Sequence, residues 1–186
     1  SVKRRRPETI VALMGCMVGP NTEELRARFP HTDVFMRPQE YGDLLRLVEA
    51  RQGVCVDSSL PLIPSRPSVA TFVPIIHGCD KFCTFCIIPY RRGRERSRPI
   101  AELVTEVELL ARRGVKEVTL LGQNVDSYGH DLPEQPDLAD LLEAVDGVQA
   151  IQRIRFLTSH PNDMSPRIVD AVARLDKVCE FINLPV

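Results

Sequence analysis

The sequence has no apolar run of the roughly 18 to 20 residues that a membrane-spanning helix needs, and it shows no signal-peptide pattern. Its six cysteines in 186 residues are too few for a disulfide-dense miniprotein. Its net charge of -1 argues against a uniformly basic coat for binding nucleic acid. We therefore expect a soluble, cytoplasmic protein with no membrane partner.

The composition that remains is that of a globular protein, with 44% hydrophobic and 26% charged residues, enough for a substantial core. The charge is unevenly distributed. Between His77 and Arg98 six cations face two acids, which gives a local charge of +4. A second cationic run, Lys3 to Arg6, opens the chain, and we expect it to form a solvated loop.

Three cysteines, Cys79, Cys83 and Cys86, lie on one short stretch, with three residues between the first pair and two between the second. Three thiolates can hold three irons of a 4Fe-4S cubane, whereas an electron-transfer cubane normally takes four cysteines. The fourth iron is then open to a substrate or cofactor. The spacing thus predicts an iron-sulfur site that takes part in chemistry, with S-adenosylmethionine (SAM) as a ligand of the open iron.

Two other interpretations of the three cysteines stay open. The thiolates together with His77 or a water could bind zinc, although zinc motifs more often have a second ligand pair far along the chain, and this sequence has none. Closely spaced cysteines also occur in disulfide scaffolds. That interpretation is weaker, because thiolates bind a soft metal in a reducing compartment, where disulfides do not persist, and because six cysteines are few for a disulfide scaffold.

Hydrophobic patterning in the first third predicts a small α/β unit, with strands at 9–14 and 34–36 and helices at 22–29 and 42–51. Gly53 is expected to end the second helix. Prolines then become frequent, and residues 60–68 are expected to be an extended linker. We place a domain boundary near Pro67, with residues 1–66 in the first domain and 67–186 in the second.

Beyond the linker, strands and helices alternate. The expected strands are 69–76, 115–121, 151–158 and 178–184, and the expected helices are 99–113, 138–145 and 166–175. This alternation predicts a parallel sheet with right-handed crossovers, of Rossmann or barrel type. A four-stranded parallel sheet whose last strand ends the chain would have an uncovered edge, so we expect a fragment of a longer barrel.

In parallel β/α folds the chemistry lies at the carboxyl ends of the strands. The polar residues expected there are His77 with the cysteine loop, the pair Gln123 and Asn124, and the pair Ser159 and His160. Each pair alone would more readily be a turn without a ligand role. Their position at one rim with a metal motif favours a functional site.

Several segments carry a family resemblance: 78–93 (GCDKFCTFCIIPYRRG), 97–99 (SRP), 120–125 (LLGQNV), 158–161 (TSHP) and 184–186 (LPV). They closely resemble the radical SAM methylthiotransferases, and the GQNV stretch is most similar to the tRNA-modifying branch, of MiaB type. The resemblance implies the C-terminal part of a small α/β methylthiotransferase N-terminal domain, then the first half of a radical SAM (β/α) partial TIM barrel. The remaining barrel and the RNA-binding TRAM domain would be absent.

For the site, the resemblance implies that Cys79, Cys83 and Cys86 bind the SAM-cleaving 4Fe-4S cluster and that Phe85 lies beside the SAM adenine. Gln123 would meet the methionine part of SAM, with Asn124, Ser159 and His160 also on the cofactor-binding rim.

Relatives hold a second 4Fe-4S cluster with three cysteines of the first domain, and Cys16 resembles the third of these ligands. Cys55 and Cys179 lie in apolar strand-like runs and are better explained as buried structural thiols. With Cys16 alone the second cluster could not assemble, so the 186-residue chain is expected to be inactive in sulfur insertion.

The implied reaction in the full-length protein adds a methylthio group to C2 of an N6-isopentenyladenosine at position 37 of tRNA, beside the anticodon. The 5'-deoxyadenosyl radical from SAM would abstract the hydrogen from C2 of the adenine. The implied partners are a flavodoxin-type electron donor and a sulfur donor. The resemblance also leads us to expect a monomer. The alternatives are a ribosomal-protein aspartate or another modified adenosine as substrate, and a non-catalytic zinc module. The basic run Arg91 to Arg98 could contact RNA phosphates or form a structural charge run.

Overall fold

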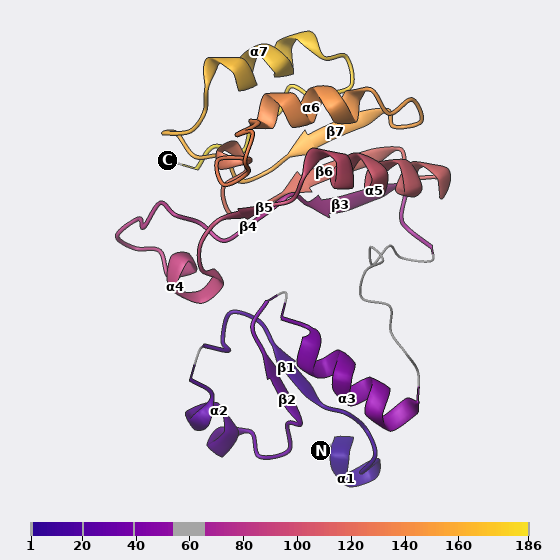
Figure 1. Cartoon of the computed structure of the whole chain (residues 1–186), viewed down its shortest axis with the longest axis vertical. Helices are drawn as coiled ribbons and strands as arrows, with labels where there is room; N and C mark the ends of the chain where they lie inside the picture. The colour runs from indigo at the N-terminus through magenta and orange to yellow at the C-terminus, as the bar shows by residue number, and fades with distance from the viewer. Residues whose placement is uncertain (1, 20, 39, 54–65, 186) are drawn as a thin grey trace. The chain divides into compact units, whose positions relative to one another are not determined.

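The computed structural model describes residues 2–19, 21–38, 40–53 and 66–185, which form two compact units. Unit 1 comprises Ser1–Leu60 and Cys83–Gly93, and unit 2 comprises Pro61–Phe82 and Arg94–Val186. Both units combine helices with parallel strands, so the chain is of mixed α/β class (Figure 1). None of the helices in the described ranges has the length and apolar character needed to cross a lipid bilayer.

Unit 1 is built on two parallel strands, β1 (Ala12–Met14) and β2 (Val34–Met36), in which Ala12 pairs with Val34. Its helices are α1 (Val2–Arg5), α2 (Glu23–Arg28), α3 (Gly42–Gln52) and α4 (Ile88–Arg92). Helix α3 ends at Gly53, whose φ of 64° lies in the left-handed region that glycine adopts without a side-chain clash. The strands and helices predicted in the first third are therefore confirmed, with shifted ends.

The carboxylate of Asp33 fastens the start of this unit. It accepts a hydrogen bond from the Val11 amide at 2.8 Å and forms ion pairs with Lys3 and, at 3.5 Å, with Arg51. The Lys3 hydrogen bond, followed by that of the Val11 amide, holds the pKa of the Asp33 carboxyl below its usual range. The loop predicted at residues 3–6 is therefore wrong for residues 3–5, which lie in helix α1, and Lys3 pairs with Asp33, whereas Arg4, Arg5 and Arg6 are exposed to solvent as predicted.

Unit 2 has a three-stranded parallel sheet in the order β3-β6-β7. The strands are β3 (Ala70–Pro74), β6 (Glu117–Leu121) and β7 (Arg153–Phe156), and the helices are α5 (Ile100–Arg112), α6 (Leu138–Asp146) and α7 (Pro166–Arg174). Helix α6 begins with a capping box between Asp137 and Asp140, and α7 begins with Ser165 as N-cap followed by Pro166. The predicted β-α alternation and parallel pairing are confirmed.

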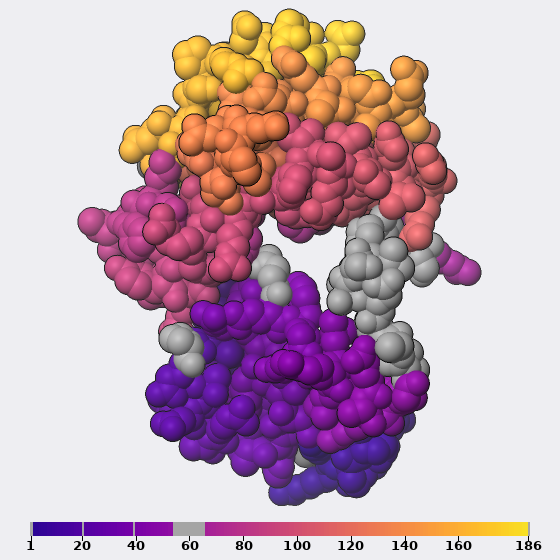
Figure 2. Space-filling view, viewed as in Figure 1, coloured from indigo at the N-terminus to yellow at the C-terminus, as the bar shows by residue number. Residues whose placement is uncertain are grey.

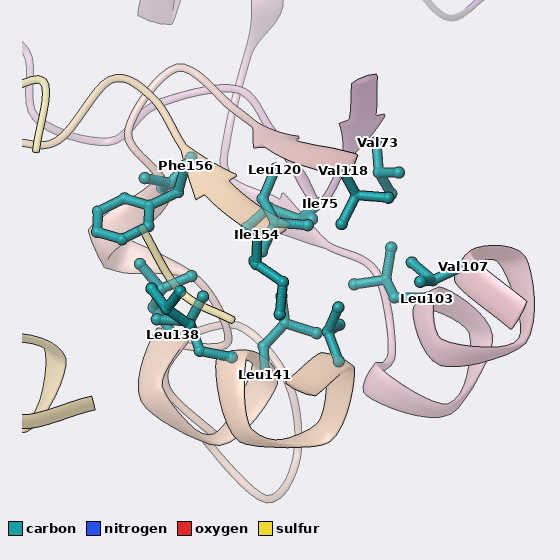
Figure 3. Close-up of a cluster of buried hydrophobic side chains, with 14 of the residues drawn as sticks. Val73, Ile75, Leu103, Val107, Val118, Leu120, Leu138, Leu141, Ile154 and Phe156 are labelled. Carbon is teal, nitrogen blue, oxygen red and sulfur yellow. The ribbon is translucent and has the colours of Figure 1, made fainter. Parts of the chain in front are cut away.

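The core of unit 2 lies between this sheet and its helices. Alternate strand residues such as Val118, Leu120 and Ile154 are fully buried against Leu103 of α5 and Leu141 of α6 (Figure 3). Burying one side chain of this size, relative to leaving it exposed, stabilises the folded state by about 1.5–3 kcal/mol. The helices α5, α6 and α7 follow one another across the sheet (Figure 1), and their atoms form one continuous packed surface (Figure 2).

The strand predicted at 69–76 is divided. Strand β3 ends at Pro74, and β4 (Ile76–His77) pairs antiparallel with β5 (Arg96–Ser97), which the sequence pattern did not indicate. The Ile75 amide still donates to Leu121 at 2.9 Å, while its carbonyl accepts from Arg98 at 2.9 Å. Ile75 is therefore the point at which the chain passes from the parallel sheet to the small antiparallel pair.

The strand predicted at 178–184 is wrong beyond its first residue. A single parallel bridge joins Ile154 to Val178, and the Phe181 amide then donates to the Cys179 carbonyl at 2.7 Å. This tight turn breaks the pairing with β7. Cys179 is half-buried rather than fully buried, and Cys55 and most of the predicted linker lie outside the described residues. The boundary at Pro67 stays a prediction.

Tyr128 fastens the chain between β6 and α6 to the segment before α5. It is fully buried, its hydroxyl donates to the Arg98 carbonyl at 2.6 Å, and burial raises the pKa of its phenol. We predict that Tyr128→Phe lowers the free energy of unfolding by about 1–3 kcal/mol, because it leaves the Arg98 carbonyl without its donor. Urea unfolding followed by circular dichroism measures this. Tyr41→Phe, at a partly exposed tyrosine, is the control and should change little.

Asp33 predicts a pH dependence for unit 1. Because its folded-state pKa is lowered, its contribution is present above its unfolded pKa of about 4 and is lost as the pH falls through the folded-state value. Asp33→Asn should therefore lower the free energy of unfolding by about 1 kcal/mol at pH 7 and have a smaller effect at pH 3. Asp43→Asn, at an exposed i,i+3 pair, should have little effect at either pH. An equal loss at pH 3 and pH 7 would contradict the role of the Asp33 charge.

Candidate functional site: the strand-end network and the cysteine loop

The loop that carries the first cysteine begins at Gly78, directly after β4. Gly78 is buried with a φ of 79°, and its amide donates to Oε1 of Gln123 at 2.7 Å. Gln123 follows the carboxyl end of β6. Gly122, just before it, leaves no room for a side chain, because a Cβ there would lie 2.4 Å from Cγ2 of Ile76. The end of β6 and the start of the cysteine loop are therefore in direct contact.

A second connection joins Lys81, on the cysteine loop, to the loop after β7. The Nζ atom of Lys81 lies 2.6 Å from Oδ1 of Asp163, and the other oxygen, Oδ2, accepts from Nδ2 of Asn124 at 2.6 Å. Asp163 is nearly buried, with 9% of its side chain exposed. One carboxylate thus links three segments: the cysteine loop, the end of β6 and the loop after β7.

A third connection runs through Glu95, just before β5. Its Oε1 atom accepts from the Asp80 amide at 3.2 Å and from the Ser127 hydroxyl at 2.9 Å. Asp80 in turn pairs with Arg94 at 2.8 Å, and the hydrogen bond from Arg94 lowers the pKa of the Asp80 carboxyl. The residues before and after Cys79 are therefore held by side chains from different parts of unit 2.

The loop after β7 is held by Asp126, a buried carboxyl in the short 3-10 helix η1 (Val125–Ser127). Its Oδ1 accepts from the Ser159 hydroxyl at 3.0 Å and its Oδ2 from the His160 amide at 2.9 Å. Burial raises the pKa of the Asp126 carboxyl, and the two hydrogen bonds oppose that rise. Asp126 therefore fixes both of the residues that the sequence placed at this strand end.

Thr158, which precedes Ser159, has a φ of 71°, a conformation that β-branched residues rarely adopt. Its hydroxyl donates to the Gly122 carbonyl at 2.8 Å, and its own carbonyl accepts from the Val125 amide at 3.1 Å. These bonds compensate the backbone strain and join the ends of β6 and β7. Strained backbone of this kind is concentrated at functional sites.

The other predicted site residues belong to unit 1. Cys83 and Cys86 are partly exposed, with the Cys86 amide donating to the Cys83 carbonyl at 2.9 Å, and Phe85 between them is 92% exposed. Cys16 is an exposed thiol in the turn that follows β1. Of the predicted site residues, Gln123, Asn124, Ser159 and His160 lie at one edge of unit 2, where the ends of β6 and β7 meet.

The donor set fits an iron-sulfur cluster in its chemistry. Cys79, Cys83 and Cys86 are thiols rather than disulfides and lie on a segment without helix or strand. In the part of the chain that the structure describes, no group of three or more His, Cys, Asp or Glu side chains lies together as metal ligands. The described residues also include one buried acceptor without a donor, Oδ1 of Asn124, which a cofactor N–H could satisfy.

The basic run divides into two kinds of residue. Arg98 donates to Glu102, Glu106 and the Pro74 carbonyl, so it has a structural role at the start of α5. Arg94 pairs with Asp80. Arg91 and Arg92 lie at the end of α4, and Arg96 is exposed on β5.

Three acidic residues of this network, Asp126, Asp163 and Glu95, were not predicted from the sequence. Asp126 follows Gln123 and Asn124 closely, and Asp163 lies three residues after His160, so proximity to the predicted site residues was the available signal. Glu95 had no such signal because its partners Asp80 and Ser127 come from segments 15 and 32 residues away.

Comparison with known proteins gives a family. Residues 73–186 match the model of the Radical SAM superfamily. The chain is 48% identical over 186 residues to a tRNA-2-methylthio-N(6)-dimethylallyladenosine synthase of Dehalococcoides mccartyi strain CBDB1, covering 100% of this chain and 42% of that protein. It is 50% identical over 187 residues to the synthase of the same name from Chloroflexus aurantiacus, with 100% and 40% covered. The chain thus spans about two fifths of the length of the curated relatives it matches.

Among solved structures, the radical SAM methyltransferase TsrM of Kitasatospora setae, with cobalamin and a [4Fe-4S] cluster bound, aligns with a TM-score of 0.48 and 19% identity. That alignment covers 62% of this chain and 22% of the methyltransferase.

The family model contains the cysteine loop, the ends of β6 and β7 and the whole strand-end network. It implies an iron-sulfur cluster and SAM as cofactors, in agreement with the three-cysteine spacing. This chain belongs to the Radical SAM superfamily.

Proposed function

We propose that the chain is part of a tRNA-modifying methylthiotransferase, which adds a methylthio group to C2 of N6-isopentenyladenosine at position 37 of tRNA. The observation that carries the proposal is the identity of about half the residues along the entire chain to synthases named for this product. The strand-end network supports it, because it joins the loop that carries Cys79 to Gln123 and Asn124, two of the residues proposed to bind the cofactor.

Cys79, Cys83 and Cys86 would hold the cluster, leaving one iron for SAM. The bound cluster and SAM supply a carbon radical that abstracts hydrogen from an unreactive C–H bond. In unit 2, Asn124 has a buried acceptor that SAM could satisfy, and Gln123 holds the cysteine loop through Gly78. In unit 1, the exposed ring of Phe85 is the side chain proposed to lie beside the adenine. Asp126 orients Ser159 and His160, the remaining proposed cofactor-binding residues.

Cys16 is the proposed ligand of a second cluster that handles the sulfur to be inserted. It is an exposed thiol in the turn that follows β1, so a metal could reach it. In the complete protein the partners would be the tRNA anticodon loop, a flavodoxin-type electron donor and a sulfur donor, in the cytoplasm. Arg91, Arg92 and Arg96 are the proposed RNA-contacting members of the basic run, because Arg94 and Arg98 are engaged within unit 2.

The remaining candidates are a methylthiotransferase for a ribosomal-protein aspartate or another modified adenosine, and a zinc-binding module. The metal content of the protein distinguishes the zinc-binding module from the enzymes, and the substrate that becomes modified distinguishes the enzymes from one another. We further propose that the present 186 residues, which include only Cys16 of the second ligand set, carry out no sulfur insertion alone.

The cluster assignment predicts the metal content of the chain. After anaerobic reconstitution it should bind about four iron and four sulfide, with the broad visible absorption of a cubane. Alanine at Cys79, Cys83 or Cys86 should each abolish most of that absorption. Cys179→Ala removes a half-buried thiol outside the motif and should leave it unchanged. Retention of zinc alone would support the zinc module and overturn the enzyme proposal.

The substrate assignment is tested with the complete product of the gene that encodes this chain. It should methylthiolate tRNA carrying N6-isopentenyladenosine and leave the ribosomal-protein aspartate unmodified, as judged by mass spectrometry. Cys16→Ala should keep reductive SAM cleavage within about twofold while methylthiolation falls at least about a hundredfold, since only the sulfur-handling cluster loses a ligand. Modification of the ribosomal protein instead would move the assignment to the other branch.

A further inference from the structure

The loop around Cys79 has no helix or strand of its own. Residues 78–82 adopt neither helix nor strand, so contacts with other parts of the chain contribute to the position of the thiol. Three do so within unit 2: Gln123 holds Gly78, Glu95 holds Asp80, and Asp163 holds Lys81. The consequence is that Cys79 is flanked on both sides by anchored residues.

Asp163 differs from the other two anchors in that its loop partner is a charged side chain, Lys81, and in that both of its carboxylate oxygens accept a hydrogen bond. Each of its oxygens has one donor, Lys81 Nζ and Asn124 Nδ2, both at 2.6 Å, and its side chain is only 9% exposed. A carboxylate with two donors at this distance, shielded from water, is among the stronger hydrogen-bonded arrangements in proteins. Breaking it would also remove the acceptor of Nδ2 of Asn124, whose Oδ1 already lacks a donor.

We infer that Asp163 is a positioning residue, which holds the cysteine loop through Lys81 and the end of β6 through Asn124, and thereby fixes Cys79 for cluster binding. It touches neither cofactor nor substrate in this role. The inference rests on the proposed function only in assigning a cluster to Cys79. The ordering of the loop by Asp163 is a property of the cluster-free chain.

The substitution Asp163→Asn tests this directly. An amide keeps the size of the side chain but replaces one acceptor oxygen with a donor, so it cannot accept from both Lys81 and Asn124. In the cluster-free chain, the amides of Gly78 and Asp80 should exchange hydrogen at least about tenfold faster than in the wild type, because the loop opens more often. After reconstitution, a chelator should remove iron about tenfold faster, while thermal unfolding by circular dichroism stays close to the wild type.

Matched variants separate this role from a general loss of stability. Asp170→Asn makes the same change at an exposed position of α7 and should leave exchange and iron loss unchanged. Lys81→Met removes the charged partner of Asp163 and should speed exchange as Asp163→Asn does. Lys81→Arg keeps a cation at this position and should exchange as slowly as the wild type. If Asp163→Asn does not fold, Lys81→Met decides the question.

The inference is overturned if a folded Asp163→Asn or Lys81→Met chain exchanges the Gly78 and Asp80 amides at the rate of Asp170→Asn. If the wild type takes up no iron, the proposed function fails, and the exchange rates still decide the role of Asp163.

Discussion

The site depends on one constraint: the thiol of Cys79 lies on a loop that is neither helix nor strand. Gly78, Asp80 and Lys81 of this loop donate hydrogen bonds to the side chains of Gln123, Glu95 and Asp163. Gln123 follows β6 and Asp163 lies in the loop after β7, so the packing of the parallel sheet helps to set where these two acceptors stand. The stability of the sheet is thereby linked to the position of the proposed ligand.

Acidic residues do most of this work in a region of local positive charge. Asp163 and Glu95 accept from the cysteine loop, and Asp126 accepts from the loop after β7. A hydrogen bond with an ionised partner is stronger than a neutral one, so a few such bonds can hold two loops together. Two other acids pair with cations of the basic run: Asp80 pairs with Arg94, and Glu106 pairs with Arg98. Part of the local excess of positive charge is therefore used in ion pairs within unit 2.

Several elements of the fold followed closely from the apolar periodicity of the sequence. Helices α5, α6 and α7 and strand β6 were predicted within a few residues, since their apolar spacing matches a single buried face. The errors came where tertiary contacts override local pattern. Lys3 pairs with Asp33 thirty residues away, β4 pairs with β5, and the chain turns at Cys179 despite an apolar, strand-like sequence.

The sequence alone determined the chemistry proposed for the site, through three cysteines at a spacing that suits a cluster with one open iron and polar residues after two strands. Such motifs are local in the chain, so spacing reveals them. Only the tertiary structure decided how the loop is held, because Asp163 and Lys81 are 82 residues apart and Ser127 and Glu95 are 32 apart. No local pattern encodes such pairs. They arise when the parallel sheet brings its strand ends to one edge.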